Sequence, residues 1–214
     1  MDGIGIRPAL CDMAKRLASN GYHVLLPNLY YRSGPTKPLD AATAFEEGTE
    51  RDRLMPLFRS LNNKLVMEDT ASFLDFLQLQ PSVAGQKIGC VGYCMGGAFA
   101  LSAAGTFPER IAAAASLHGA RLATDQLDSP HLLASKMRAG IYVGIAGIDP
   151  NFAPDEKQRL ESAFQSEGVE HTVEVYPDVK HGFAVNDTPV YDRLASERHW
   201  QTILKLFAGN LSLP

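Results

Sequence analysis

Three residues of this 214-residue chain could together perform nucleophilic chemistry on an acyl group: Cys94, Asp149 and His181. Cys94 stands in the sequence Gly-Tyr-Cys-Met-Gly-Gly (residues 92–97), where a short apolar run ends and a stretch of small residues begins. This pattern is typical of a nucleophile elbow, the tight turn between a strand and a helix that presents a nucleophile, here with cysteine in place of serine. Flanking glycines keep such a turn nearly free of side chains, and the N-terminus of the following helix favours a thiolate.

The six residues around Cys94 alone also fit a second interpretation, a glycine-rich turn that holds a buried structural cysteine. The other two residues favour the nucleophile. Asp149 and His181 each follow a predicted strand, and parallel α/β sheets collect functional residues at the carboxyl ends of their strands. The order nucleophile, acid, histidine is that of the α/β-hydrolases. We therefore expect a triad in which Cys94 attacks an acyl carbonyl, His181 transfers protons and Asp149 orients the imidazole.

Backbone N–H groups beside Cys94 are expected to stabilise the oxyanion that forms during the attack. The N–H of Met95, the residue after the nucleophile, is one predicted donor. The loop at Gly3 and Ile4 is predicted to provide the second donor, since its glycines suit a close approach of the backbone to a ligand.

Other residues near the predicted strand ends allow alternatives. His118 follows a strand and is interpreted either as a residue of the pocket wall or as a structural residue. We also expect Tyr93 and Phe183 to contact the substrate. Asp178 is an alternative acid, but it precedes His181 on the same predicted loop.

Strands and helices must alternate along the chain to bring these residues together. The hydrophobic pattern predicts strands at residues 22–26, 87–91, 111–116, 141–145 and 171–175, with helices before, between and after them. This alternation requires a mostly parallel sheet covered by helices on both faces, an α/β fold. Residues 28–64 lack a clear period and are interpreted either as a lid or as a solvated connector with one or two short helices.

The composition is that of an ordinary globular protein with a sizeable core. Hydrophobic residues make up 45% of the chain and charged residues 21%, and 214 residues suit a single domain spanning 1–214. The net charge of −4 argues against a nucleic-acid partner, and no apolar run is long enough to cross a membrane. The first residues lack the pattern of a signal peptide, and the three cysteines lack the spacing of a metal site. We expect a reduced, cytoplasmic protein.

Five segments of the chain resemble the dienelactone hydrolase family. They are residues 2–8 (Asp-Gly-Ile-Gly-Ile-Arg-Pro), residues 92–97, Asp149 with residues 152–154 (Phe-Ala-Pro), residues 175–184 and residues 191–200. The resemblance covers nearly the whole chain. It implies an α/β-hydrolase fold, a Cys-His-Asp triad, no metal or cofactor, and hydrolysis of small lactones or esters.

Two positions depart from the pattern of that family. An acidic residue near the oxyanion loop helps to convert the resting thiol to a thiolate in the family, and Asp2 stands at about this place instead of a glutamate. Members that act on dienelactone hold the substrate carboxylate with arginines, one of them four residues after the histidine, where this chain has Val185. The resemblance therefore does not imply dienelactone itself as the substrate.

The resemblance also implies a central strand before Asp2, between the predicted strand at residues 22–26 and the strand that leads to Cys94. We therefore expect this chain to be a shortened form of a longer protein. Besides hydrolysis of small esters or lactones, the same triad suits an acyltransferase or a thioesterase. A third interpretation is a binding protein of low activity on a hydrolase scaffold. The sequence leaves the oligomeric state open.

Overall fold

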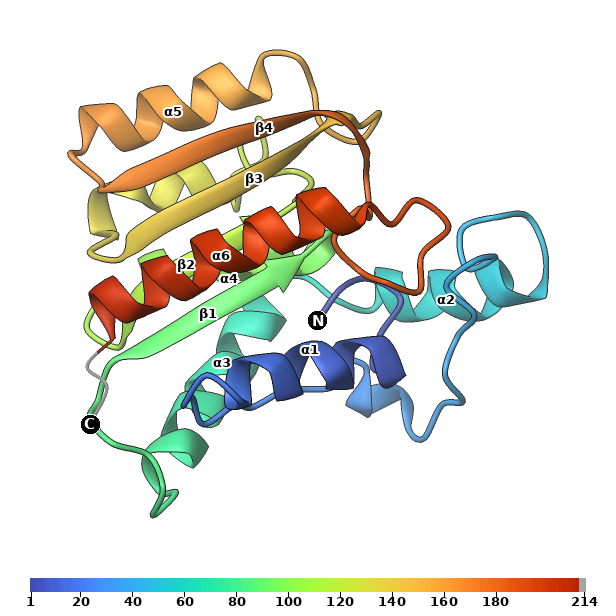
Figure 1. The fold of residues 1–214 in the computed structure, drawn as a ribbon, viewed down its shortest axis with the longest axis horizontal. Coiled ribbons are helices and arrows are strands. Elements are labelled where there is room, and N and C mark those ends of the chain that lie inside the picture. The colour runs from blue at the N-terminus through green and yellow to red at the C-terminus, as the bar shows by residue number, and fades with distance from the viewer. Residues whose placement is uncertain (212–214) are drawn as a thin grey trace.

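Four parallel strands form the sheet of this protein. In the computed structural model, which describes residues 1–211, they are β1 (Ile88–Tyr93), β2 (Ile111–Leu117), β3 (Gly140–Ile148) and β4 (His171–Lys180), and they lie side by side in this order (Figure 1). Each strand runs parallel to its neighbour, so all four carboxyl ends lie at one edge of the sheet. This edge, which we call the carboxyl edge, is where the predicted site residues are expected to meet.

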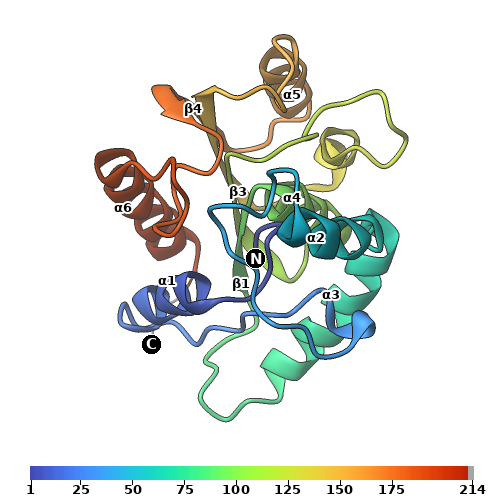
Figure 2. The same cartoon turned by 90° about the vertical axis from the view of Figure 1, so that its right-hand side faces the viewer.

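Helices cover both faces of the sheet, as Figures 1 and 2 show. On one face lie α1 (Pro8–Ala18) and α6 (Arg193–Asn210), and on the other α3 (Asn63–Gln78), α4 (Met95–Thr106) and α5 (Glu156–Ser166). The remaining helical segments are η1 (Tyr31–Ser33), α2 (Thr49–Arg59) and η2 (Pro130–Lys136). None of the helices within residues 1–211 is both long and apolar enough to cross a membrane.

Alternate residues of the strands enter two separate cores. In β3, Tyr142 and Ala146 pack toward α1 and α6, whereas Ile141, Val143 and Ile145 pack toward the other three helices. Strands that are buried on both faces consist of nearly continuous apolar residues, which is the pattern that the sequence shows. The predicted α/β fold with a parallel sheet and helices on both faces is therefore confirmed.

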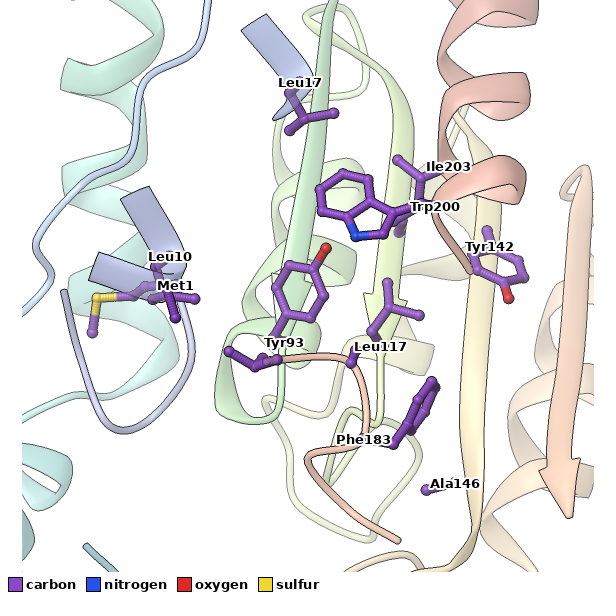
Figure 3. Close-up of a cluster of buried hydrophobic side chains, with 14 of the residues drawn as sticks. Met1, Leu10, Leu17, Tyr93, Leu117, Tyr142, Ala146, Phe183, Trp200 and Ile203 are labelled. Carbon is purple, nitrogen blue, oxygen red and sulfur yellow. The ribbon is translucent and has the colours of Figure 1, made fainter. Parts of the chain in front are cut away.

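The strand predicted at residues 22–26 is wrong, because this segment forms no ladder with β1. An apolar cavity of about 340 Å³ lies beside β1, and both the segment and β1 contribute to its lining. Met1 and Leu10 line it on one side, and Tyr93 and Trp200 line it on the other (Figure 3). A strand requires a neighbouring backbone for its N–H and C=O groups, and residues 22–26 have no strand beside them within residues 1–211.

Residues 28–64 contain η1, α2 and the first two residues of α3, and the rest of the segment is irregular, as the sequence predicted. Leu39, Ala44 and Leu54 of this segment are buried in a small apolar cluster with Ile4. Since Ile4 belongs to the loop that is predicted to hold an oxyanion, the segment packs directly against this loop. Whether it acts as a lid stays a prediction.

The strand β4 is longer than the predicted strand at residues 171–175 and also includes residues 176–180. The ladder between β3 and β4 shifts register between Ala146 and Ile148. A Cβ on Gly147 would lie 2.3 Å from the Pro177 oxygen, so only glycine allows the two backbones to approach here. This irregularity carries β4 on to Lys180 and places His181 directly after the strand.

The packing of α6 on the sheet gives a first prediction. Ile203 is fully buried in α6, whereas Leu194 of the same helix is 72% exposed. We expect Ile203→Ala to lower the free energy of unfolding by about 2–5 kcal/mol, because it removes buried methyl groups and leaves a cavity. Leu194→Ala, the matched control, should change it by less than about 0.5 kcal/mol. Urea unfolding of both variants measures the difference, and equal stabilities would contradict the packing described here.

Candidate active site

Cys94 stands alone between β1 and α4, in the strand–turn–helix arrangement that the sequence predicted. It has a positive φ of 54°, which non-glycine residues rarely adopt. Its N–H donates a hydrogen bond to the Leu117 carbonyl (3.0 Å), and its own carbonyl accepts one from the Gly97 N–H (3.0 Å). A Cβ on Gly92 would lie 1.8 Å from the Gly96 oxygen, which explains the glycines in this turn. The elbow thus presents the thiol at the carboxyl edge of the sheet, at the N-terminus of a helix.

The structure brings His181 and Asp149 together. His181 opens the histidine loop, by which we mean residues 181–192, and Asp149 follows β3. Their atoms Nδ1 and Oδ2 are 2.6 Å apart. The Asp149 side chain is only 2% exposed, and the imidazole is 18% exposed. Asp178, the alternative acid, is instead an exposed residue of β4.

Cys94 lies close enough to the same imidazole to favour its protonated form. Burial disfavours the protonated ring, but hydrogen bonds and charge interactions with Asp149 and Cys94 outweigh burial and raise the pKa of His181 to about 10. A protonated imidazole beside the sulfur is the partner that stabilises a thiolate. The three predicted triad residues therefore meet in one cluster, in the order sulfur, imidazole, carboxylate.

The predicted substrate contacts Tyr93, His118 and Phe183 do not face solvent. Their exposed fractions are 4%, 1% and 0%, so these side chains form a buried layer beneath the imidazole of His181. The ring of His118 packs edge-on against the rings of His181 and Phe183, with centroids 5.0 and 5.5 Å apart. The prediction that these three residues contact the substrate is therefore corrected, because each side chain turns into the core from the end of its strand or loop.

The N-terminal loop, residues 2–5, lies against the first turn of α4. A Cβ on Gly96 would be only 2.0 Å from the Met1 oxygen, so the residue just before this loop touches α4 through its backbone. Of the three predicted oxyanion donors, Ile4 is already engaged, since its N–H donates to Asp2 Oδ1 (3.0 Å). The N–H groups of Met95 and Gly3 make no hydrogen bond within residues 1–211. These two donors remain as candidates, and Ile4 is corrected to a structural role.

Asp2, predicted to modulate the nucleophile, is held by Arg7. Arg7 donates two hydrogen bonds to its carboxylate, at 2.9 and 2.8 Å, and no hydrogen bond joins Asp2 to Cys94 in the described part of the chain. The sequence contains Arg7 directly before the first helix, but nothing there indicates its partners. Val185, which stands where the family has an arginine, is 1% exposed and belongs to the core.

Within residues 1–211, no three His, Cys, Asp or Glu side chains are arranged to hold a metal ion. The candidate site consists of the thiol, the imidazole, the buried carboxylate and the two backbone N–H groups. Such a set can perform nucleophilic acyl chemistry with protein groups alone.

A parallel sheet with a nucleophile elbow after a strand is the arrangement of the α/β-hydrolases. Solved structures share this fold. The structure described as "Putative Dienelactone Hydrolase" from Klebsiella pneumoniae has a TM-score of 0.82 and 22% sequence identity, over 97% of this chain and 83% of that one. A dienelactone hydrolase-like promiscuous phosphotriesterase from metagenomic libraries has a TM-score of 0.76 and 22% identity, over 98% and 83% of the two chains.

The sequence profile of the dienelactone hydrolase family matches residues 1–211, so this chain belongs to the dienelactone hydrolase family. A protein of Synechocystis sp. named "Putative carboxymethylenebutenolidase" is 24% identical over 213 residues, which is 97% of this chain and 82% of that protein. The resemblance that the sequence segments suggested is confirmed. The protein is thus a member of a hydrolase family.

The surroundings of His181 predict an unusual titration. We expect an NMR titration of its imidazole to give an apparent pKa near 10 instead of 6.5. Asp149→Asn should lower this pKa, because the substitution removes a hydrogen bond and a negative charge that favour the protonated ring. Folding raises this pKa, so the protonated ring stabilises the fold fully below about pH 6.5, and this contribution is lost as the pH rises through about 10.

Asp178→Asn is the matched control for this titration, since Asp178 lies close in sequence but is exposed on β4. It should leave the titration of His181 nearly unchanged. A wild-type titration at the ordinary value of 6.5, or equal effects of the two asparagine substitutions, would contradict the geometry of the triad.

The geometry of the elbow predicts that alanine substitutions at two glycines have very different effects on stability. Gly92→Ala should prevent folding or destabilise the protein by several kcal/mol, because its Cβ would lie 1.8 Å from the Gly96 oxygen and the backbone would have to move. Gly209→Ala is the control, since a Cβ on Gly209 in α6 has no neighbour within 4 Å. That substitution should be neutral or stabilise the helix by up to about 1 kcal/mol. Thermal unfolding followed by circular dichroism compares the two, and a Gly92→Ala protein of wild-type stability would refute the elbow.

Proposed function

We propose that this protein hydrolyses small esters or lactones through a Cys94-His181-Asp149 triad and an acyl-thioester intermediate. The observation that carries the proposal is the cluster itself. A thiol at the N-terminus of α4 lies close to an imidazole whose Nδ1 is 2.6 Å from a buried carboxylate. The membership in a hydrolase family supports the same reaction class.

Acylation begins with the Cys94 thiolate and the protonated His181. The sulfur attacks the carbonyl carbon of the substrate, and the carbonyl oxygen becomes an oxyanion that accepts hydrogen bonds from the N–H groups of Met95 and Gly3. When the intermediate collapses, the bond to the alcohol oxygen breaks and His181 donates its proton to that oxygen. In a lactone this oxygen stays attached to the acyl group, so ring opening gives a hydroxy-acyl thioester.

Deacylation uses the same groups in reverse. The neutral His181 takes a proton from a water molecule, which attacks the thioester carbonyl and forms a second oxyanion at the same N–H groups. The carbon–sulfur bond then breaks, and the products are the carboxylic acid and the regenerated thiolate beside a protonated imidazole. Asp149 holds the tautomer and orientation of the ring throughout, as the acid of a triad does.

The surroundings favour an uncharged substrate. Arg7, which belongs to the N-terminal loop region, is buried and paired with carboxylates, so it is not free to bind a substrate carboxylate. Val185 adds no charge and is buried. We therefore propose small neutral esters or lactones as substrates. We also place the protein in the cytoplasm, a proposal that rests on its three free cysteines.

Two measurements test this proposal, namely alkylation of the thiols and turnover of esters and lactones. In a Cys11→Ser background, iodoacetamide should alkylate Cys94 stoichiometrically at neutral pH, while Cys90 serves as an internal control, since burial raises the pKa of its thiol to about 12. p-Nitrophenyl acetate and a set of small lactones should be turned over. Cys94→Ala and His181→Ala should lower kcat/KM at least about 10³-fold, the order expected when a triad residue is removed.

The matched control for turnover is Cys90→Ala, which removes a thiol from β1 just before the elbow without touching the triad. It should keep most of the activity. The proposal fails if Cys94→Ala hydrolyses the esters and lactones as the wild type does. It also fails if Cys94 of the folded wild type is alkylated no faster than Cys90.

A further inference from the structure

We propose that Arg7 is a positioning residue, which ties the N-terminal loop to the histidine loop and thereby holds the Gly3 N–H in place for the oxyanion. The inference rests on the function proposed above and assigns a role to a residue outside the triad. Its basis is a buried ion-pair network that joins two parts of the chain 180 residues apart.

One side of the guanidinium holds the N-terminal loop. Nη1 and Nη2 donate to the two carboxylate oxygens of Asp2 at 2.9 and 2.8 Å, and Nη1 also donates to the Gly5 carbonyl at 3.0 Å. The same carboxylate accepts hydrogen bonds from the N–H groups of Ile4 and Gly5. Every residue around Gly3 in this loop is therefore tied, directly or through Asp2, to one cation.

The other side of the guanidinium holds the histidine loop. Nε and Nη2 donate to the two carboxylate oxygens of Asp187 at 2.7 and 3.0 Å. Asp187 belongs to a compact turn, in which the Thr188 hydroxyl donates to the Gly182 carbonyl at 3.0 Å and the Asp192 N–H donates to the Phe183 carbonyl at 3.1 Å. His181 begins this turn. These hydrogen bonds lie within the histidine loop and do not involve Arg7, so the loop offers Asp187 as a fixed anchor for the guanidinium.

Burial and geometry make arginine necessary at this position. The Arg7 side chain is 3% exposed, Asp2 is 6% exposed and Asp187 is 34% exposed, so the network lies mostly out of solvent. A guanidinium can donate two parallel hydrogen bonds to each of two carboxylates in its plane, and a lysine ammonium cannot. Removal of this cation would leave two carboxylates facing each other, one of them buried, which is strongly unfavourable.

The Gly3 N–H and the triad depend on different contacts. Cys94 and His181 follow strands of the sheet, whereas Gly3 is positioned by the network and by a hydrogen bond from the Tyr30 hydroxyl to its carbonyl (2.6 Å). A weakened network should therefore displace an oxyanion donor without moving the thiol or the imidazole. Stabilisation of an oxyanion is sensitive to small displacements, since a donor has to lie about 2.7–3.1 Å from the charged oxygen.

A comparison of ester turnover with thiol alkylation distinguishes a displaced Gly3 N–H from a disturbed thiol or imidazole. Iodoacetamide reacts with the thiolate at a saturated carbon and forms no oxyanion, whereas p-nitrophenyl acetate requires both the thiolate and the oxyanion donors. We expect Arg7→Lys and Asp187→Asn to lower kcat for the ester about 10- to 100-fold, the effect of a displaced oxyanion donor. The KM and the rate of Cys94 alkylation should stay within about twofold of the wild type.

Asp178→Asn is the matched control, because Asp178 is an exposed aspartate before His181 without an ion pair in the described residues. It should leave kcat and alkylation unchanged. The inference is overturned if Arg7→Lys and Asp187→Asn keep the kcat of the wild type. It is also overturned if alkylation falls in parallel with kcat, since the network would then support the fold as a whole.

If Arg7→Lys does not fold, Asp187→Asn alone tests the inference. Asp187 is partly exposed, and the Asp187→Asn variant still contains the ion pair between Arg7 and Asp2. A wild-type protein that shows alkylation of Cys94 but no turnover of any ester or lactone would overturn the proposed function, and this inference with it. Wild-type turnover with unaffected variants would overturn this inference alone.

Discussion

The close contact between Gly92 and the backbone of Gly96 is the constraint on which the candidate site depends. β1 and α4 meet here without a side chain between them, and the chain that joins them has to turn within a single residue. This turn forces Cys94 into a positive φ, a conformation that costs about 1–3 kcal/mol in a non-glycine residue. The hydrogen bond from its N–H to Leu117 and the buried packing of α4 on the sheet offset that cost.

Burial beneath the elbow also gives the histidines different protonation states. Burial lowers the pKa of His199 to about 3 and that of His118 well below its ordinary value, so both rings are neutral beneath the site. His181 lies above them and has a buried carboxylate as its partner, which reverses the direction of the shift. One charged imidazole therefore stands on a layer of neutral aromatic rings. In such surroundings its interactions with Cys94 and Asp149 are screened little by solvent.

The sequence predicted the order of strands and helices because apolar periodicity and glycine turns are local signals. It also predicted that Cys94, Asp149 and His181 meet, since the carboxyl ends of parallel strands share one edge. It did not predict the direction in which Tyr93 and Phe183 turn, because at a strand end one residue decides between core and solvent. The sequence could not predict the partners of Arg7 either, because Asp187 lies 180 residues away and exposed aspartates are common. Residues 22–26 carry the apolar pattern of a strand, but a strand also requires a partner.

The candidate site thus rests on two parts of the fold that differ in how they are held. The thiol and the imidazole follow β1 and β4, the two outer strands of the sheet, which are held by their ladders with β2 and β3. The N-terminal loop instead lies between α4 and residues 28–64, where Ile4 packs against Leu54 and Tyr30 binds the Gly3 carbonyl. This loop is buried, but side-chain hydrogen bonds and packing hold it in place of a strand ladder. An opening of this loop would remove a candidate oxyanion donor while leaving Cys94, His181 and Asp149 together, so the reactivity of the thiol and the turnover of an ester need not change together.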